Sequence, residues 1–270
     1  MMKKITSILF LALVFNSCGE YQKVLKSDDY NYKYTKAVAY YEAEDFNRAM
    51  PLFNELSTVL RGTAKMQEVS YYFAYCHYSA SDNLMAAYLF KNYTQNYPNG
   101  KHTEECAYMS AYCYYLEAPD YSLDATNNYK AINELQTFVD RFPLSDRVEK
   151  CNELLDELRT VLSKKAFENA KQYFTTENYK SAIIALENVL IDFPSYSNRE
   201  EVYFLIVKSS YLLAINSIST KVISRLKSTL DAYSQFKDNY PNSDLIKDLE
   251  NTYNKTNQTL TELKEKKDEI

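Results

Sequence analysis

Small and aromatic residues recur along this chain at a fixed spacing, with polar residues between them. Three segments begin with alanine and continue with aromatic residues, and each leading alanine stands 37 residues after the one before: Ala37-Val38-Ala39-Tyr40-Tyr41, Ala74-Tyr75-Cys76-His77-Tyr78 and Ala111-Tyr112-Cys113-Tyr114-Tyr115. Residues three and four positions apart share one face of a helix. A period of this length predicts a stack of similar helical units.

Each unit is predicted to contain a second helix. Ala49 and Phe53 recur 37 residues later as Ala86 and Phe90, and a third copy, Ala131 and Leu135, follows 45 residues after that. The extra residues fall around Glu117-Ala118-Pro119-Asp120, where we expect a loop. Proline cannot continue a helix, so four prolines mark the ends of the later units: Pro98, Pro143, Pro194 and Pro241. The first unit has Arg61-Gly62 at the corresponding place.

This spacing resembles the tetratricopeptide pattern, in which small residues let two antiparallel helices approach closely and proline closes the unit. The sequence predicts an all-α, right-handed α-solenoid of about five tetratricopeptide-like helix pairs with a closing C-terminal helix. We assign units 1–3 to residues 27–143. A long linking helix and units 4–5 occupy residues 144–242, and the closing helix covers residues 243–270.

Composition agrees with helices and excludes several other classes. The chain has three glycines, too few for sheets with tight hairpins, phosphate-binding loops or nucleotide-binding crossovers. Its net charge of −5 is mild and mixed in sign, which argues against a nucleic-acid partner because such a surface needs a basic stripe. Tyrosine is abundant, with 27 residues, while tryptophan is absent.

The amino terminus has the features of a secretory signal. Lys3 and Lys4 precede an apolar run from Ile5 to Phe15, which is too short to span a bilayer. The following Asn16-Ser17-Cys18 resembles a lipobox, although Phe15 stands where leucine is usual. We expect a signal peptide over residues 1–17, lipidation of Cys18 with membrane attachment through that lipid, and a lipidated tether over residues 18–26. The alternative is an ordinary signal peptide with a coincidental cysteine.

No residue set predicts catalysis, a cofactor or a metal site. His77 stands in a slot that tyrosine fills in the sister units and is expected to pack, while His102 follows a glycine-containing turn and is expected to be solvated. Cys76 and Cys113 hold the same repeat position and are expected to be small buried residues. A disulfide between them remains the alternative. We therefore expect a binding protein rather than an enzyme.

One group of residues exceeds what folding alone requires. In tetratricopeptide arrays the first helix of each pair lines a concave groove, and its positions 5, 9 and 12 are almost all tyrosine here: Tyr34, Val38 and Tyr41; Tyr71, Tyr75 and Tyr78; Tyr108, Tyr112 and Tyr115. Tyrosine offers an aromatic face and one polar tip. These residues predict a groove for an extended, aromatic-rich peptide. The alternative is an aromatic ladder that only packs adjacent first helices.

Taken together, the chain resembles the BamD family of tetratricopeptide lipoproteins. The resemblance rests on these segments: Cys18-Gly19-Glu20-Tyr21, Ala39-Tyr40-Tyr41, Phe46 to Leu56, Tyr114-Tyr115-Leu116-Glu117-Ala118-Pro119, Tyr129-Lys130-Ala131-Ile132, Lys165-Ala166-Phe167-Glu168-Asn169-Ala170 and the aromatic-proline unit ends. It implies a lipid-anchored protein on the periplasmic face of the outer membrane. It also implies that the C-terminal repeats dock on a POTRA domain of a BamA-like barrel protein. The N-terminal repeats would then receive the aromatic-ended targeting segment of unfolded outer-membrane β-barrel proteins.

Two other functions remain open from the sequence. A glycan-binding lipoprotein of the SusD type also uses tetratricopeptide helices, but those chains are usually longer and rich in tryptophan. A periplasmic scaffold for envelope growth is the other function, and no residue of this chain excludes it. Partner identity distinguishes the three.

Overall fold

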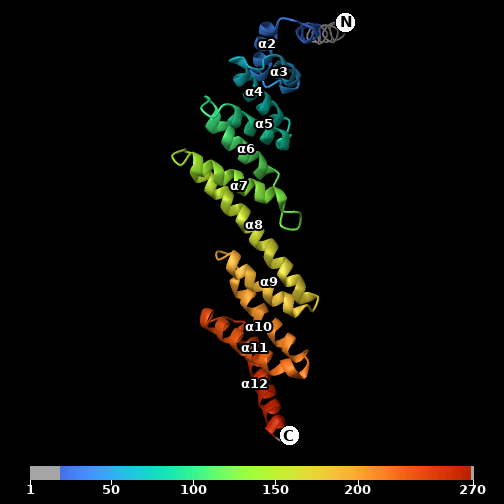
Figure 1. The fold of residues 1–270 in the computed structure, drawn as a ribbon, viewed down its shortest axis with the longest axis vertical. Coiled ribbons are helices and arrows are strands. Elements are labelled where there is room, and N and C mark those ends of the chain that lie inside the picture. The colour runs from blue at the N-terminus through green and yellow to red at the C-terminus, as the bar shows by residue number, and fades with distance from the viewer. Residues whose placement is uncertain (1–18, 269–270) are drawn as a thin grey trace, which may run out of the picture. The chain divides into compact units, whose positions relative to one another are not determined.

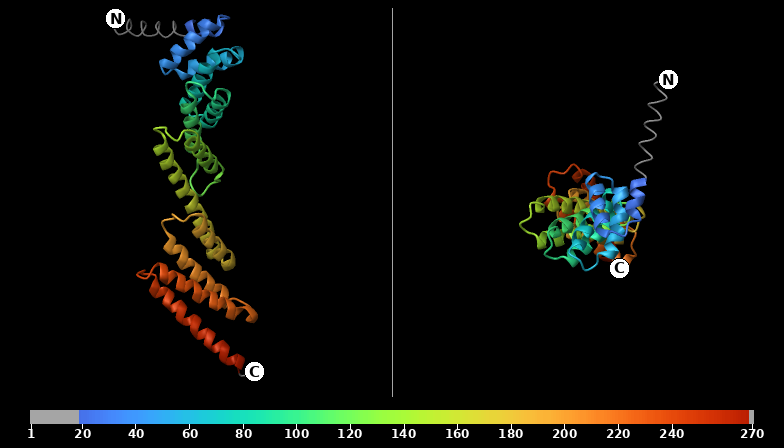
Figure 2. Two further views of the ribbon diagram at one scale, coloured as in Figure 1. Left: turned by 60° about the vertical axis from the view of Figure 1, so that its left-hand side comes forward. Right: turned by 90° about the horizontal axis from the view of Figure 1, so that it is seen from above.

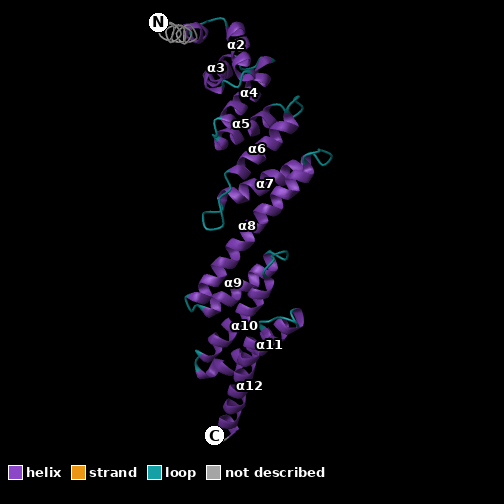
Figure 3. Ribbon diagram, turned by 180° about the vertical axis from the view of Figure 1, so that it is seen from behind, coloured by secondary structure: helices purple, strands orange, loops and turns teal. Residues whose placement is uncertain are grey.

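The computed structural model describes residues 19–268 of the 270-residue chain. Within this range the regular elements are helices, and no residue is in a strand (Figure 3). Labelled as in Figure 1, the helices are α2 (Tyr30–Glu42), α3 (Phe46–Val59), α4 (Lys65–Ser79), α5 (Asn83–Asn96), α6 (Thr103–Leu116), α7 (Thr126–Arg141), α8 (Val148–Thr175), α9 (Tyr179–Asp192), α10 (Arg199–Ile215), α11 (Ser219–Asn239) and α12 (Ile246–Asp268). The all-α repeat fold predicted from the sequence is confirmed.

The chain forms two compact units. Within the described residues, the first comprises 19–119 and 124–155, and the second comprises 120–123 and 156–268. In the first unit α2 pairs with α3, α4 with α5 and α6 with α7, and each pair packs on the next (Figure 1). In the second unit α9, α10 and α11 pack in succession, and α12 lies against α10 and α11 (Figure 2).

Alanine at matching positions brings the paired helices together. The alanines of the repeat pattern are fully buried, both in the first helices and in the second: Ala37, Ala74, Ala111, Ala49, Ala86, Ala131 and Ala182. A small side chain lets two helix backbones approach, while the bulky residue one turn later fills the space to the next helix. Phe53, Phe90 and Leu135 do this and are also fully buried.

The turns inside and between the pairs follow from local sequence. Asp29 caps α2 by accepting hydrogen bonds from the backbone N–H groups of Asn31 and Tyr32. Between paired helices, Glu44, Ser81 and Glu177 adopt left-handed backbone conformations with φ of 58°, 59° and 62°. As expected, helices end just before the repeat prolines, and their C-cap residues are Tyr97, Phe142, Phe193 and Tyr240.

The segment expected as a lipidated tether is helical over most of its length. Residues 19–25 form a helix, Val24 is fully buried in the core of the first unit, and the Tyr21 hydroxyl donates to the Arg48 carbonyl at 3.2 Å. The prediction of a lipidated tether over residues 18–26 specified no conformation, and the structure adds that residues 19–25 are helical and pack on the first unit. The predicted signal peptide and Cys18 lie outside the described residues.

The four cysteines in the described range are free and buried: Cys76, Cys106, Cys113 and Cys151. The alternative of a disulfide between Cys76 and Cys113 is thus not seen. Burial raises the pKa of the Cys76 thiol to about 12, and it raises that of Cys113 to about 12 as well. Both cysteines act as small core residues, as predicted.

Candidate peptide-binding face

The nine predicted groove residues lie on three successive first helices of the first unit. Tyr34, Val38 and Tyr41 are on α2, the next trio is on α4, and Tyr108, Tyr112 and Tyr115 are on α6. Each of the nine is half-buried, and we call this set the tyrosine face. The same helices turn fully buried residues such as Ala37, Ala74 and Ala111 toward the core. The helical period therefore separates a core side from a partly accessible aromatic side.

Within α4 and α6 the tyrosine rings touch along the helix. On α4 the ring centroids of Tyr71 and Tyr75 are 4.9 Å apart. On α6 the rings of Tyr108 and Tyr112 stack at 5.8 Å with an interplanar angle of 10°, and those of Tyr112 and Tyr115 stack at 6.0 Å. Each trio thus forms a short aromatic column rather than three separate side chains.

The columns also pack inward. The rings of Tyr41, Tyr75 and Tyr108 lie edge-on to core phenylalanines, with centroid distances of 6.5 Å to Phe53, 4.9 Å to Phe90 and 5.8 Å to Phe138. Tyr41 additionally contacts Tyr72 of α4 at 4.7 Å, so aromatic rings do join adjacent first helices. The tyrosine face contributes to packing while part of each side chain remains accessible, and its use as a groove stays a prediction.

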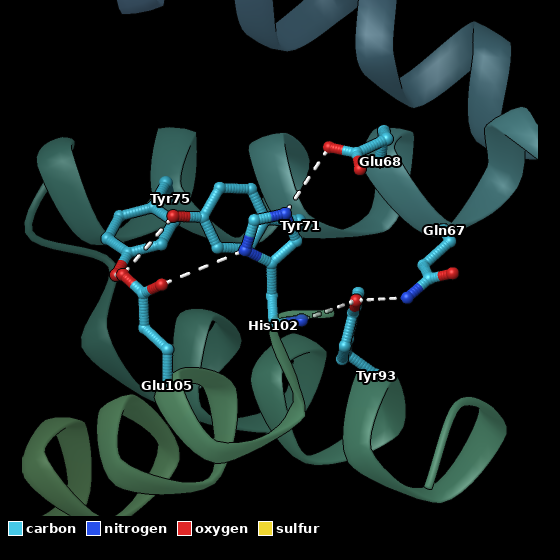
Figure 4. Close-up of polar contacts among 7 residues, drawn as sticks. All are labelled: Gln67, Glu68, Tyr71, Tyr75, Tyr93, His102 and Glu105. Carbon is cyan, nitrogen blue, oxygen red and sulfur yellow. Dashed lines mark hydrogen bonds and ion pairs between the residues drawn. The ribbon is translucent and has the colours of Figure 1, made fainter. Parts of the chain in front are cut away.

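Glu105 of α6 fixes two tyrosines of α4. Its Oε1 accepts hydrogen bonds from the hydroxyl of Tyr75 at 2.5 Å and from that of Tyr71 at 3.2 Å (Figure 4). Burial, reinforced by this carboxylate, raises the pKa of both hydroxyls well above the ordinary value of tyrosine. The two hydroxyls therefore remain protonated donors, and the second and third repeats are linked through a polar contact inside an aromatic surface.

His102 departs from the sequence prediction. It was expected to be solvated, but its side chain is only 15% exposed and its ring stacks on Tyr71 with centroids 4.0 Å apart. Glu68 Oε2 lies 3.5 Å from Nε2, which is buried and has no hydrogen-bond partner, and Glu105 Oε2 lies 3.8 Å from Nδ1 (Figure 4). The backbone N–H of His102 donates to the Tyr93 hydroxyl at 3.3 Å, which holds the turn in place.

The repeat period also relates these two carboxylates to each other. Glu68 and Glu105 are 37 residues apart, the same interval that separates Tyr71 from Tyr108. Each stands three residues before the first tyrosine of its trio, as Asn31 does in the first repeat. Asn31 Oδ1 accepts from Lys65 Nζ of the second repeat at 2.7 Å, so this place in the pattern contacts the next repeat there too.

Cations lie over the tyrosines at both ends of the face. Lys65 Nζ is 5.3 Å from the ring centroid of Tyr34, and the Arg147 guanidinium is 5.2 Å from that of Tyr108. His77 packs as expected, with its ring 4.8 Å from Phe73. Within residues 19–268 no group of three or more histidine, cysteine or acidic residues could hold a metal ion. Aromatic faces and fixed hydroxyls suit the binding of a peptide.

Fold and face together define an all-helical repeat protein of the tetratricopeptide type with an aromatic surface on its first helices. Residues 26–226 match the family of outer membrane lipoproteins denoted YfiO, and the chain belongs to that family. No helix in the described range is both long and apolar enough to cross a membrane.

Other comparisons add little. No curated protein sequence matches the chain. Among solved structures, it is similar to the TPR2AB-domain:pHSP90-complex of yeast Sti1, with 16% identity, 84% of this chain and 98% of that chain covered, and a TM-score of 0.40. The repeat assignment rests on the helix pairs and the matching buried alanines of this chain.

Proposed function

We propose that this chain is a non-enzymatic, lipid-anchored scaffold on the periplasmic face of the outer membrane, which assembles β-barrel proteins. The tyrosine face receives segments of unfolded barrel proteins, and the C-terminal repeats dock on a POTRA domain of a BamA-like barrel protein. Membership of an outer membrane lipoprotein family supports the location. The half-buried tyrosine columns are the observation that carries the receiving role.

Substrate chemistry agrees with this assignment. Strands of membrane barrels alternate apolar and polar residues and are rich in aromatics where they meet the membrane surface. An extended strand of this kind presents an apolar side chain at every second residue, and the aromatic ones among them can contact the half-buried rings of the tyrosine face. Tyrosine hydroxyls can also bond the unpaired backbone groups of an unfolded strand.

The second unit offers a different surface for a protein partner. Ile184 and Ile191 are 52% and 72% exposed and lie seven residues apart on α9, so they share one face of that helix. Ile215 and Ile218, at the turn from α10 to α11, are 46% and 66% exposed. Several large apolar residues that face water within one unit support a docking role for it.

The receiving role can be tested with barrel-derived peptides. A variant that carries both Tyr75→Leu and Tyr112→Leu should bind an extended, aromatic-rich peptide from an outer-membrane strand at least about tenfold more weakly, because stacking contacts of about 1 kcal/mol or more are lost at each site. Tyr129→Leu, on α7 and 61% exposed outside the tyrosine face, is the matched control. Unchanged peptide affinity in the folded double variant would disprove the groove.

Docking can be tested by affinity capture of the protein from a detergent-solubilised envelope. The proposal expects that a POTRA-bearing barrel protein is captured in near-equal amount. A variant with both Ile184→Asp and Ile191→Asp should no longer capture this barrel protein. Capture of a TonB-dependent transporter instead would favour a SusD-type glycan-binding role. Capture of cell-wall enzymes alone would favour a scaffold for envelope growth.

A further inference from the structure

A cavity of about 500 Å³ lies in the first unit between α3, α4 and α5, away from the tyrosine face. Its α4 wall is formed by Met66, Ser70 and Phe73. At 100° per residue, these side chains leave the helix about 140° around the axis from Tyr71, Tyr75 and Tyr78. The cavity is therefore separate from the tyrosine face.

The charge at the cavity wall is positive. Arg61 is the only charged residue among the described residues that line it, in a chain whose net charge is −5. Arg61 stands twelve residues after Ala49, the position at which the later units carry Pro98, Pro143, Pro194 and Pro241. The first repeat thus replaces its closing proline with a guanidinium at a cavity wall, and Gly62 beside it turns the chain with φ of 78°.

Two carboxamides face the same cavity. Asn92 and Asn96 of α5 line it. Arg61 and Asn96 are exposed and Asn92 is half-buried, and within residues 19–268 none of these three side chains has a hydrogen-bond or ion-pair partner. A carboxamide donates and accepts at once, as a peptide group requires. Four helical residues span about 6 Å along the axis. Alternate peptide groups of an extended chain are about 6.6 Å apart. The pair therefore matches the backbone of an extended peptide.

The apolar part of the lining is supplied by Met66 and Phe73 of α4 and by Leu89 of α5. We propose that the cavity is a second peptide-binding site, which takes an extended segment that carries an acidic side chain two residues from an apolar one. Residues two apart point to the same side of an extended chain. The acid pairs with Arg61, the carboxamides bind the backbone, and the apolar side chain contacts Phe73 and its neighbours. This site does not depend on the function of the tyrosine face.

Calorimetric titration of the detergent-purified protein tests the proposal. The probe is a blocked hexapeptide, acetyl-Gly-Gly-Leu-Gly-Glu-Gly-amide, and its partner has Gln in place of Glu. The Glu peptide should bind saturably, and Arg61→Gln should weaken it about tenfold, as expected for loss of a charge-assisted hydrogen bond. Asn92→Ala should also weaken it. Lys130→Gln, which removes an exposed cation elsewhere in the unit, should have no effect.

Several results of this titration would overturn the site. Binding that is equal for both peptides, or unaffected by Arg61→Gln in a protein with an unchanged melting curve, overturns the site. So does the lack of saturation up to about 1 mM, the weak end of specific affinity. If Arg61→Gln instead abolishes binding to phosphatidylglycerol vesicles and leaves peptide binding intact, the cavity is a headgroup site. Retention of Glu-peptide binding in the Tyr75→Leu, Tyr112→Leu variant would separate this site from the tyrosine face.

Discussion

The hydroxyl of Tyr75 on α4 lies 2.5 Å from Oε1 of Glu105 on α6, so the second and third repeats share a hydrogen bond within the tyrosine face. The carboxylate is 31% exposed and also accepts from Tyr71. A charged acceptor strengthens both bonds and keeps the two rings in one orientation. Rings fixed in this way lose little conformational entropy when a peptide stacks on them.

Removal of this carboxylate should destabilise the first unit. In Glu105→Ala the hydroxyls of Tyr75 and Tyr71 lose their acceptor, which should lower the free energy of unfolding by about 1–2 kcal/mol. Glu105→Gln keeps an acceptor oxygen and should lose less. Urea unfolding followed by circular dichroism measures the effect, with Glu149→Ala, at an exposed position of the same unit, as the control. Equal stability of the Ala variant and the wild type would show that the contact is energetically neutral.

Alkaline pH should weaken the fold through Tyr41. Burial, helped by the neighbouring Cys76 and Tyr72, raises the pKa of Tyr41 to about 12. The unfolded chain releases this proton near pH 10, whereas the folded chain retains it to higher pH. Stability is therefore complete below about pH 10 and falls between about 10 and 12. The slope should stay below about 1.4 kcal/mol per pH unit, because the ring is only half-buried.

Tyr41→Phe cannot ionise and should flatten this decline. Urea midpoints between about pH 8 and pH 11 provide the measurement. The decline should persist in part, because Tyr71 and Tyr75 have pKa values shifted in the same direction. A pH dependence identical in the variant and the wild type would mean that Tyr41 titrates alike in both states.

The repeat period predicted the helices well because it reflects packing of one helix on the next. Ala37, Ala74 and Ala111 are all fully buried, and the tyrosine trios fall on one side of their helices as expected. The contacts of His102 could not be predicted, because they depend on how the turn between α5 and α6 brings its ring against Tyr71 of the preceding repeat. The helix at residues 19–25 was not predicted from the sequence, because its packing depends on tertiary contacts such as that of Val24 with the core of the first unit.

Replacement of Glu177, which has a left-handed backbone conformation, by glycine should stabilise the protein. Glu177 has φ of 62° at the turn between α8 and α9, a conformation that costs a residue with a side chain about 1 kcal/mol. Glu177→Gly should raise stability by somewhat less than this, because glycine also gains entropy in the unfolded chain. Glu187→Gly, the same change inside α9, should lower it by about 1 kcal/mol. Thermal melts that shift in the same direction for both variants would contradict this.

The buried thiols should be inert in the folded protein. Burial raises the pKa of Cys151 to about 11 and that of Cys106 higher still, so almost no thiolate is present near neutral pH. A thiol reagent should label none of Cys76, Cys106, Cys113 and Cys151 rapidly in the native state, and all four in guanidinium chloride. A fifth equivalent after unfolding would mean that the sulfur of Cys18 carries no lipid. Rapid native labelling of one of the four would show that its helix opens locally.

Lys33 should hold residues 19–25 against the first repeat. Its side chain is 2% exposed, and Nζ donates to the Leu25 carbonyl at 3.0 Å and to Glu55 Oε1 at 2.6 Å. Lys33→Met keeps the apolar stem but leaves that carbonyl without its partner, at a cost of about 1–2 kcal/mol. Residues 19–25 should then exchange their amide hydrogens faster, while α4 to α7 remain protected.

Lys36→Met is the matched control, because Lys36 pairs with Glu20 of the same segment but at the surface, with side chains 33% and 61% exposed. Such exposed pairs contribute little, so hydrogen exchange in residues 19–25 should hardly change. If both variants exchange alike, the buried ammonium has no special role. If only Lys33→Met releases the segment, the lipid proposed on Cys18 joins the first repeat through a packed helix. The anchor would then restrict the orientation of the tyrosine face, which a flexible tether would leave free.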